Sequence, residues 1–353
     1  MKPHTKQVWS INQLFILMAS MSIVLLAMKF SADILVPLLI ASAIAILLAP
    51  LIKYLERKYI PKIVSLVFVT VLVFLPVMAL GGFIGEEVED FIRNYATMEK
   101  EFNIWLNNIS HSMSKLGISV TAEDLRATLN KSNFGELIQG LVTQTKNQFS
   151  NIFWIFFLVA FILMDSTYLY NKLLKIMNDR EGSIEEGMEI IEKIKTYFLI
   201  KVKTSLITAL WILLVLWFYD IHYAFLWATL VFFFNFIPVV GSIFAAIPAV
   251  IVALLDHSMM TAIWIAMWYM IVNTVIGNIL EPRIMGKGLG LSALTIFISM
   301  IFWGWMFGPA GMILSVPLTM GIQFLFDQYD ETKWIAFMLG DYREEEDIIL
   351  KSS

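Results

Sequence analysis

Charged residues are grouped along this chain, and long apolar intervals without any charge separate the groups. A helix that crosses a membrane needs about 20 consecutive apolar residues, and several of the intervals have this length. The first interval has an apolar run too long for a secretory signal and no small-residue cleavage site, so we expect it to remain as an anchor. The fourth is expected to continue through Asp165 to Tyr170. Conventional membrane spans are predicted over residues 11–28, 34–52, 63–84, 147–164, 204–219 and 258–280.

Two further intervals are too long to be single membrane helices. Residues 221–255 form 35 positions and residues 288–326 form 39 positions without a charge. At a rise of about 1.5 Å per residue, straight helices would measure roughly 52 and 58 Å, whereas the hydrocarbon core is about 30 Å thick. Both intervals contain Pro and Gly near the middle, and these residues interrupt helices. We therefore predict two legs for each interval, with breaks at Pro238 and Gly241 and at Gly308 and Pro309.

The two broken intervals also resemble each other in sequence. Each has a run of aromatic residues followed by Pro and Gly at the break, and each has a second proline further on, Pro248 or Pro317. The two prolines are ten residues apart in the first interval and eight in the second, so chance similarity remains an alternative to internal duplication. Paired hydrophobic segments interrupted by Gly or Pro are the best sequence indication of a transporter's binding site.

Lysine and arginine in short loops indicate the cytoplasmic side of a membrane protein. Residues 53–62 carry four basic residues and one acid, which predicts a cytoplasmic N-terminus. Residues 86–146 then lie outside, where nine acids outnumber six bases, and apolar residues at helical spacing indicate a small helical subdomain. The predicted organisation is a three-span region (1–85), the extracytoplasmic insertion (86–146), a fourth span (147–171), a cytoplasmic amphipathic helix (172–203), a transport region (204–326) and an acidic cytoplasmic tail (327–353).

The amphipathic helix over residues 172–203 is expected to run directly into the fifth span. Apolar residues recur in it three or four positions apart, with charged residues between them. We interpret it as a connector that packs against the bundle, with a regulatory or partner-binding helix as the alternative.

The composition supports a lipid environment and excludes several classes of function. Hydrophobic residues make up 59% and charged residues 15% of the 353 positions, and the mean hydropathy is +0.75, whereas soluble domains carry roughly 25% charge. The net charge of -4 argues against nucleic-acid binding, and the absence of Cys excludes disulfides and thiolate-bound metals. The four histidines are scattered, so we expect no metal site and no cofactor. Motifs for ATP binding, metalloproteases and serine hydrolases are absent, which predicts a protein that is not an enzyme.

Ionisable and amide residues inside membrane spans are costly, and they are therefore candidates for function. Asn273, Gly277 and Glu281 are four residues apart, which predicts a polar stripe on one helix face. A second stripe with the same spacing contains Thr319. The candidate binding or gating residues are Asn235, Pro238, Gly241, Asn273, Asn278, Glu281, Arg283, Gly308, Pro309 and Thr319, and the candidates for ion coupling are Asp165 and Glu281.

Structural explanations compete with these functional ones. Asp165 is also explained as an interfacial charge, and Asn273 and Asn278 as amides that join helices. Glu281 and Arg283 flank a proline, where they form either an ordinary ion pair at a helix end or a gate for a polar substrate.

Motifs in the C-terminal half resemble those of one known family. They are Phe236-Ile237-Pro238-Val239-Val240-Gly241, Asn278-x-x-Glu281-Pro282-Arg283, and Gly308-Pro309-x-Gly311 followed by Ser315-Val316-Pro317-Leu318-Thr319. In these residues the chain resembles the autoinducer-2 exporter (AI-2E) family of membrane transporters, over roughly residues 10–330. The resemblance implies about eight membrane helices, an extracytoplasmic insertion after the third, and a homo-oligomer with a pentamer as the candidate form.

We therefore predict an all-α integral membrane protein with about eight transmembrane helices, two broken or re-entrant segments and a small helical extracytoplasmic insertion. The expected location is a bacterial-type inner membrane, with both termini in the cytoplasm. If each broken interval crosses the membrane once, eight crossings place residues 281–287 outside. If each crosses twice, ten crossings place them inside.

Three functions are compatible with this organisation. Amides outnumber acids in the spans, which favours a secondary exporter of a small polar solute such as the autoinducer-2 signal. The alternative is a sodium (or lithium)/proton antiporter, an activity that the resemblance also implies, in which Asp165 and Glu281 bind the exchanged ions. The third hypothesis is a membrane scaffold or permeability factor whose external insertion binds a partner.

Overall fold

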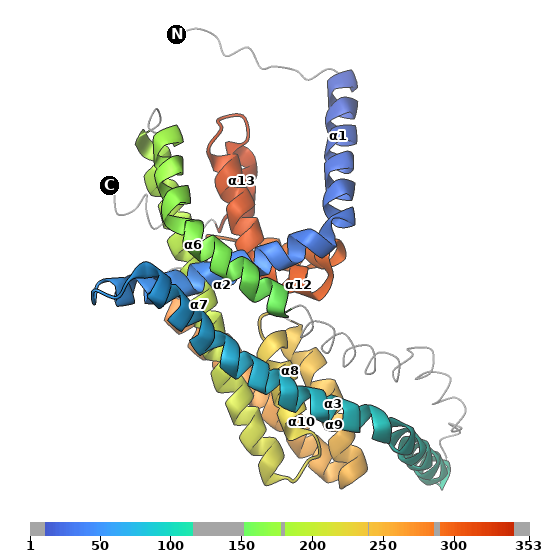
Figure 1. The fold of residues 1–353 in the computed structure, drawn as a ribbon. Helices are drawn as coiled ribbons and strands as arrows, with labels where there is room; N and C mark the ends of the chain where they lie inside the picture. The colour runs from blue at the N-terminus through green and yellow to red at the C-terminus, as the bar shows by residue number, and fades with distance from the viewer. Residues whose placement is uncertain (1–10, 116–151, 178–180, 239, 286–289, 342–353) are drawn as a thin grey trace.

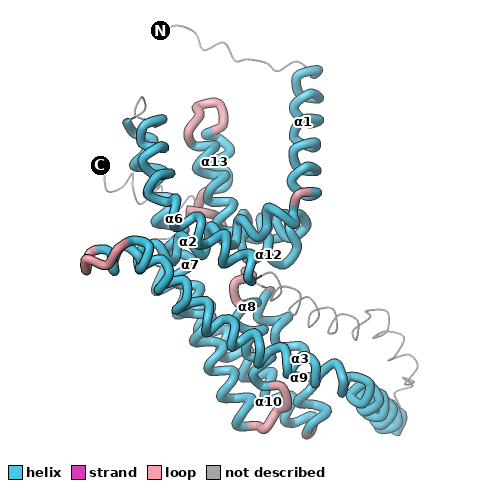
Figure 2. Tube along the Cα trace, viewed as in Figure 1, coloured by secondary structure: helices cyan, strands magenta, loops and turns pink. Residues whose placement is uncertain are grey.

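The computed structural model describes residues 11–115, 152–177, 181–238, 240–285 and 290–341, and all regular secondary structure in these ranges is helical (Figures 1 and 2). The helices are joined by short connections in most places. Their bounds are α1 Ile11–Phe30, α2 Ala32–Glu56, α3 Lys62–Lys115, α6 Ile152–Met177, α7 Glu181–Phe218, α8 Ala224–Phe234, α9 Gly241–Asp256, α10 Met259–Asn273, the π-helix η1 Thr274–Leu280, α11 Glu281–Met285, α12 Ala293–Asp327 and α13 Lys333–Leu339.

The described residues confirm an all-α protein with several helices suited to a membrane. Five helical stretches are long and apolar enough to cross one. Shorter apolar stretches lie within α1, α6, α8 and α9. The five stretches are Ala32–Glu56, Lys62–Asn94, Gly187–Phe218, Met259–Ile284 and Ala293–Asp327.

Helix α3 is much longer than the span predicted over residues 63–84. It continues as one helix of 54 residues into the predicted extracytoplasmic insertion. Val88 and Phe91 at the start of that insertion are buried, as their spacing suggests, but α3 runs from the span into them without a break. The rest of the insertion, residues 116–146, lies outside the described residues.

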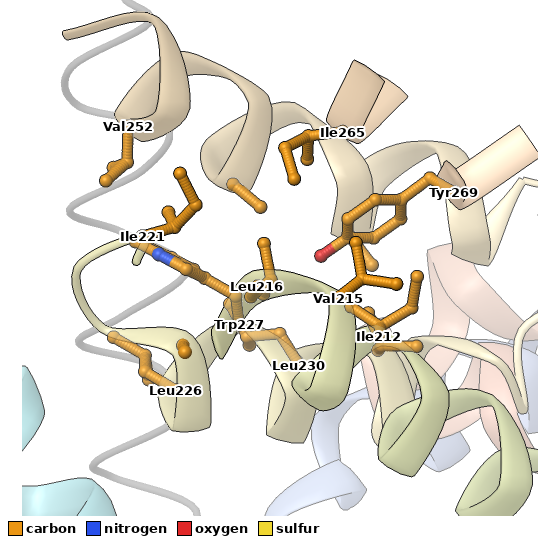
Figure 3. Close-up of a cluster of buried hydrophobic side chains, with 14 of the residues drawn as sticks. Ile212, Val215, Leu216, Ile221, Leu226, Trp227, Leu230, Val252, Ile265 and Tyr269 are labelled. Atoms are coloured by element: carbon orange, nitrogen blue, oxygen red, sulfur yellow. The ribbon is translucent and has the colours of Figure 1, made fainter. Parts of the chain in front are cut away.

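Helix α7 confirms that the amphipathic segment and the fifth span are continuous. It has 38 residues, and its two halves belong to different parts of the core. Tyr197 and Phe198 lie in one buried cluster with Leu314 and Met320 of α12. The later part of α7 packs with α8, α9 and α10 in a second cluster, where Leu216 and Trp227 are fully buried (Figure 3).

The first overlong interval forms a helical hairpin made of α8 and α9. Helix α8 has only 11 residues, which corresponds to about 16 Å and is too short to cross a hydrocarbon core. The two ends of the hairpin meet, because the Asp256 Oδ2 atom accepts a hydrogen bond from the His222 backbone N–H at 3.0 Å. Beside it, His257 Nε2 lies 3.2 Å from the Asp220 carbonyl oxygen. The predicted break at residues 235–241 is therefore the tip of this hairpin.

The second overlong interval, α12, is also folded back on itself. Gly308 has φ 64° and ψ -150°, a backbone conformation that is essentially restricted to glycine. The two legs on either side are joined by a hydrogen bond from Trp303 Nε1 to Thr319 Oγ1 at 3.1 Å. At the open end, Gln323 Nε2 donates to the Gly290 carbonyl oxygen at 3.0 Å. Both predicted breaks are thus confirmed as reversals of the chain.

The two hairpins pack on opposite ends of α7. Figure 1 shows α8, α9 and α10 around one end of α7, and α12 and α13 near the other. The tip of the α8–α9 hairpin nevertheless reaches the second group, because Phe236 belongs to the same buried cluster as Leu314 and Val316 of α12. The middle of α7 is therefore the place where both hairpins meet one helix.

Candidate functional site

A row of buried polar side chains runs along one face of α7. Lys201, Thr204, Ser205 and Thr208 are all less than 9% exposed. Thr204 and Ser205 are adjacent, and each lies three or four residues from Lys201 and from Thr208, which places all four on the same side of the helix. The opposite side carries exposed apolar residues such as Leu206 and Leu210, so this part of α7 is polar inside and apolar outside.

The centre of the site is a buried ion pair between α7 and α11. Lys201 Nζ lies 2.6 Å from Glu281 Oε1, and both side chains are close to nine-tenths buried. The same ammonium donates a hydrogen bond to the Asn235 carbonyl oxygen at 3.3 Å. Thr204 Oγ1 donates to the other carboxylate oxygen, Glu281 Oε2, at 3.5 Å. The opposite charges are therefore paired, and each ionised group also has a neutral hydrogen-bonding partner, which helps to offset the cost of burying the pair.

The tip of the α8–α9 hairpin supplies the third part of the site. Asn235 is the C-terminal cap of α8, and carbonyl groups in the last turn of a helix have no partner within the helix. Its carbonyl oxygen is therefore available to Lys201. Its side chain is buried as well, and Asn235 Nδ2 donates to Ser205 Oγ at 3.0 Å. The break in the helix thus places a backbone acceptor and an amide next to the ion pair.

The π-helix η1 positions Glu281. It covers Thr274–Leu280, and Glu281 follows directly as the first residue of α11. Because π-helices bond residues five apart, Ile276 and Glu281 both point into the protein and are buried. Asn278 lies between them on the exposed side. Short π-helical segments inside α-helices often occur at functional sites, and this one turns the only carboxylate of the cluster inward.

The structure brings together some of the predicted site residues and separates others. Asn235 and Glu281 lie in the cluster, and Pro238 and Gly241 lie in the adjacent hairpin tip. Asn273 is half-buried, and its side chain lies against Gly277 rather than against the ion pair. Glu281 pairs with Lys201, whereas Arg283 is exposed, so the ordinary Glu281–Arg283 ion pair is not formed.

The remaining predicted residues lie elsewhere. Gly308, Pro309 and Thr319 belong to the α12 hairpin, where Thr319 holds the two legs together. Asp165 is exposed on α6, next to Met164, whose carbonyl oxygen accepts a hydrogen bond from Lys62 Nζ at 2.9 Å. Asp165 and Glu281 therefore do not share one site among the described residues.

Sequence reasoning missed the α7 side of the site. The charge pattern predicts Lys201 within the cytoplasmic amphipathic helix, because charges end at residue 203, but the structure shows it buried beside Glu281. A signal was present: Lys201, Thr204, Ser205 and Thr208 are the polar positions on one face where the helix turns apolar. An isolated lysine on such a face needs a partner, and Glu281 was the candidate carboxylate.

A second polar network links α3 to the start of the α8–α9 hairpin. Glu87 Oε2 accepts a hydrogen bond from the Leu226 backbone N–H at 2.7 Å, which caps the first turn of α8. The Tyr223 hydroxyl donates to Asp90 Oδ2 and accepts from Asn94 Nδ2, both at 3.1 Å. Partial burial raises the pKa of the Tyr223 phenol. The long helix α3 thus fixes the open end of the hairpin.

The described residues contain no group of three or more His, Asp or Glu side chains arranged for a metal ion. The described residues form a multi-pass helical membrane protein in which two hairpins approach one helix beside a buried ion pair. The chain belongs to the AI-2E family of transporters, whose family model matches residues 17–331.

Several curated bacterial proteins are similar over nearly their whole length. The "AI-2 transport protein TqsA" of Escherichia coli (strain K12) is 32% identical over 333 residues, which are 94% of this chain and 97% of the relative. A relative in Haemophilus influenzae is 30% identical and covers 92% of this chain and 95% of its own. YhhT of Escherichia coli (strain K12) is 28% identical, with 92% and 93% covered. The names of the last two suggest transport and give no substrate.

Proposed function

We propose that this transporter exports a small, polar, uncharged solute of the autoinducer-2 type, and that the cluster around Lys201 and Glu281 is the solute-binding and coupling site. The observation that carries the proposal is the buried ion pair itself, which lies beside the broken end of α8. A charge pair inside membrane helices is costly, and such pairs mark transport pathways in membrane proteins. The 32% identity to the AI-2 transport protein TqsA supports the choice of solute class.

The chemistry of the cluster suits a polar, uncharged solute. The charges of Lys201 and Glu281 cancel, so the site as a whole does not attract a net charge. The other groups are neutral hydrogen-bonding groups: the Asn235 amide, its backbone carbonyl, and the hydroxyls of Thr204 and Ser205. Backbone groups freed at helix breaks commonly bind substrates in transporters, because they are not used inside a helix.

Removing both charges together should abolish transport without unfolding the protein. The double variant Lys201→Met with Glu281→Gln leaves no unpaired buried charge, and uncharged replacements of buried ion pairs are often neutral for stability. We expect export of autoinducer-2 from loaded liposomes to fall at least tenfold. Asn278→Ala, on the exposed side of the same π-helix, is the matched control and should transport normally. Normal export by the folded double variant would exclude this cluster as the transport site.

A specific contact also supports the second candidate, sodium/proton antiport. The Lys201 ammonium is held by a carboxylate oxygen and a backbone carbonyl oxygen, and oxygen atoms of these kinds also bind alkali cations. In this mechanism Lys201 would release its proton when Na⁺ takes its place at Glu281 and the Asn235 carbonyl. Liposomes with a sodium gradient and an internal pH dye distinguish the two candidates. Antiport would be favoured if the wild type shows sodium-driven proton flux and the double variant loses it. The exporter would be favoured if the wild type shows no such flux but still exports the solute.

We further propose that the two hairpins are re-entrant and do not cross the membrane. Helices α1, α2, α3, α6, α7 and α10 would then be the crossings, α8–α9 would enter from outside and α12 from the cytoplasm. Both termini would be cytoplasmic, in the inner membrane of a bacterium. The exposed apolar residues on helices such as α3 and α7 suit lipid and a homo-oligomer, with a pentamer as the candidate.

Cysteine labelling distinguishes a hairpin with no net crossing from an α8–α9 segment that crosses once, because the chain contains no native Cys. We expect His257→Cys to react with a membrane-impermeant maleimide added outside intact cells. Arg283→Cys should react only after the cells are opened, together with the cytoplasmic reference Lys58→Cys. If Arg283→Cys is labelled from outside instead, the α8–α9 segment crosses the membrane once, and the hairpin topology is wrong.

A further inference from the structure

Tyr197 lies about one helical turn before Lys201 on α7, and the mechanism proposed above does not use it. It is placed four residues before Lys201 on α7, so it belongs to the same buried face of the helix. Its side chain is 1% exposed. Tyr197 is therefore a further polar residue on the buried face of α7 that carries Lys201 and Thr204.

The Tyr197 hydroxyl differs from the other polar groups of the cluster because it has no hydrogen-bond partner among the described residues. Lys201, Thr204, Asn235 and Glu281 are all bonded to one another or to the backbone. Buried hydroxyl groups are nearly always paired, because an unpaired one costs free energy. The buried Tyr197 hydroxyl is thus available to a molecule that enters this region.

The surroundings of the ring place this hydroxyl between the two hairpins. Tyr197 packs edge-on against Phe198, with ring centroids 5.6 Å apart. It shares a buried cluster with Phe236 from the α8–α9 tip and with Leu314 and Met320 from the second leg of α12. A solute held by the ion-pair cluster and by Tyr197 would therefore contact the parts of the protein that meet at the middle of α7.

We propose, on the basis of the function proposed above, that Tyr197 determines solute specificity by donating a hydrogen bond from its hydroxyl to an oxygen atom of the transported molecule. Its partner is a hydroxyl or carbonyl oxygen of a neutral, oxygen-rich solute. The donated O–H pairs with such an oxygen atom and not with a cation, so loss of the hydroxyl should weaken binding of the solute and leave binding of Na⁺ at Glu281 and the Asn235 carbonyl unchanged. In this proposal Lys201 and Glu281 bind the solute and couple its transport, whereas Tyr197 discriminates between solutes.

The conservative variant Tyr197→Phe removes only the hydroxyl and keeps the packed ring. We expect it to fold as well as the wild type, with an unchanged or higher unfolding temperature, because a buried unpaired hydroxyl is lost. In proteoliposomes, the concentration of autoinducer-2 that gives half-maximal export should rise about threefold to tenfold, the usual effect of one hydrogen bond, while the maximal rate is retained. Any sodium or proton flux of the protein should keep its half-saturating concentration.

Tyr269→Phe is the matched control. Tyr269 is also buried with an unpaired hydroxyl, but it lies among the apolar side chains Ile212, Val215 and Ile265 (Figure 3). Its loss should leave the half-saturating concentration unchanged. An unchanged value in Tyr197→Phe, in a protein whose wild type exports the probe, overturns the specificity role alone. If the wild type moves neither autoinducer-2 nor small polyols, the proposed export function fails, and the role of Tyr197 fails with it.

Discussion

Replacing Lys201 alone with methionine is expected to destabilise the protein by about 3 to 5 kcal/mol, the usual effect of removing one partner of a buried ion pair. Glu281 would then be a buried carboxylate whose remaining neighbour is the Thr204 hydroxyl at 3.5 Å. Glu281→Gln should have an effect of similar size, because the buried Lys201 charge would keep only neutral acceptors, the glutamine amide oxygen and the Asn235 carbonyl oxygen at 3.3 Å. Thermal unfolding of the purified protein in detergent measures both effects.

The double variant Lys201→Met with Glu281→Gln provides the control for these single substitutions. It contains no unpaired charge, so its unfolding temperature should return close to the wild-type value. A double-mutant cycle then gives a coupling energy of several kcal/mol between the two positions. If the two single effects simply add in the double variant, Lys201 and Glu281 do not interact, and the centre of the site is assigned incorrectly.

Adding a single methyl group at Gly241 or Gly311, at the two hairpin tips, should also lower the stability of the protein strongly. A Cβ atom at Gly241 would lie 1.7 Å from the Phe234 carbonyl oxygen, and one at Gly311 would lie 2.0 Å from the Trp303 carbonyl oxygen. Both obstacles are backbone atoms, which cannot move without opening the turn. We therefore expect Gly241→Ala and Gly311→Ala each to destabilise the protein by more than about 3 kcal/mol, an effect reserved for severe steric changes. Solute export by Gly241→Ala should be lost as well, since the tip of α8–α9 carries Asn235.

Gly321 and Gly82 provide matched controls for these two substitutions. Both lie within helices, and a Cβ atom at either position would meet nothing within 4 Å. Alanine there should be neutral or should stabilise the helix by about 0.5 to 1 kcal/mol. Unfolding temperatures of the four variants test the prediction together. Wild-type stability of Gly241→Ala or Gly311→Ala would show that the legs of that hairpin are not closely packed.

The two close contacts also bear on the internal repeat. In both hairpins, a glycine at the start of the second leg lies against a carbonyl oxygen near the end of the first leg. The turns are nevertheless built differently, since Gly308 has a positive φ and the α8–α9 turn uses a proline and no glycine with positive φ among its described residues. The similarity of the two breaks therefore has a physical basis in close packing of the legs, which both duplication and convergence explain.

Charge distribution and helix breakers determined much of this protein from the sequence by itself. Apolar intervals about 20 residues long have to be helices in lipid, and intervals of 35 and 39 residues with Pro and Gly at the centre cannot be single straight helices. These are local properties, so the two breaks could be placed within a few residues. The length of α3 could not be predicted from the sequence. One continuous helix and two helices with a short joint would show the same apolar spacing.

The tertiary structure decided which polar residues meet. Lys201 and Glu281 are 80 positions apart, and Asn235 lies between them in the sequence, so no local pattern relates the three. Their contact depends on the hairpin reversing at residues 235–241 and on the π-helix turning Glu281 inward while Asn278 stays exposed. An i, i+4 pattern assumes a regular α-helix and does not include that change in register. The sequence therefore determined the helices and their breaks, and packing of distant segments alone determined the buried ion pair.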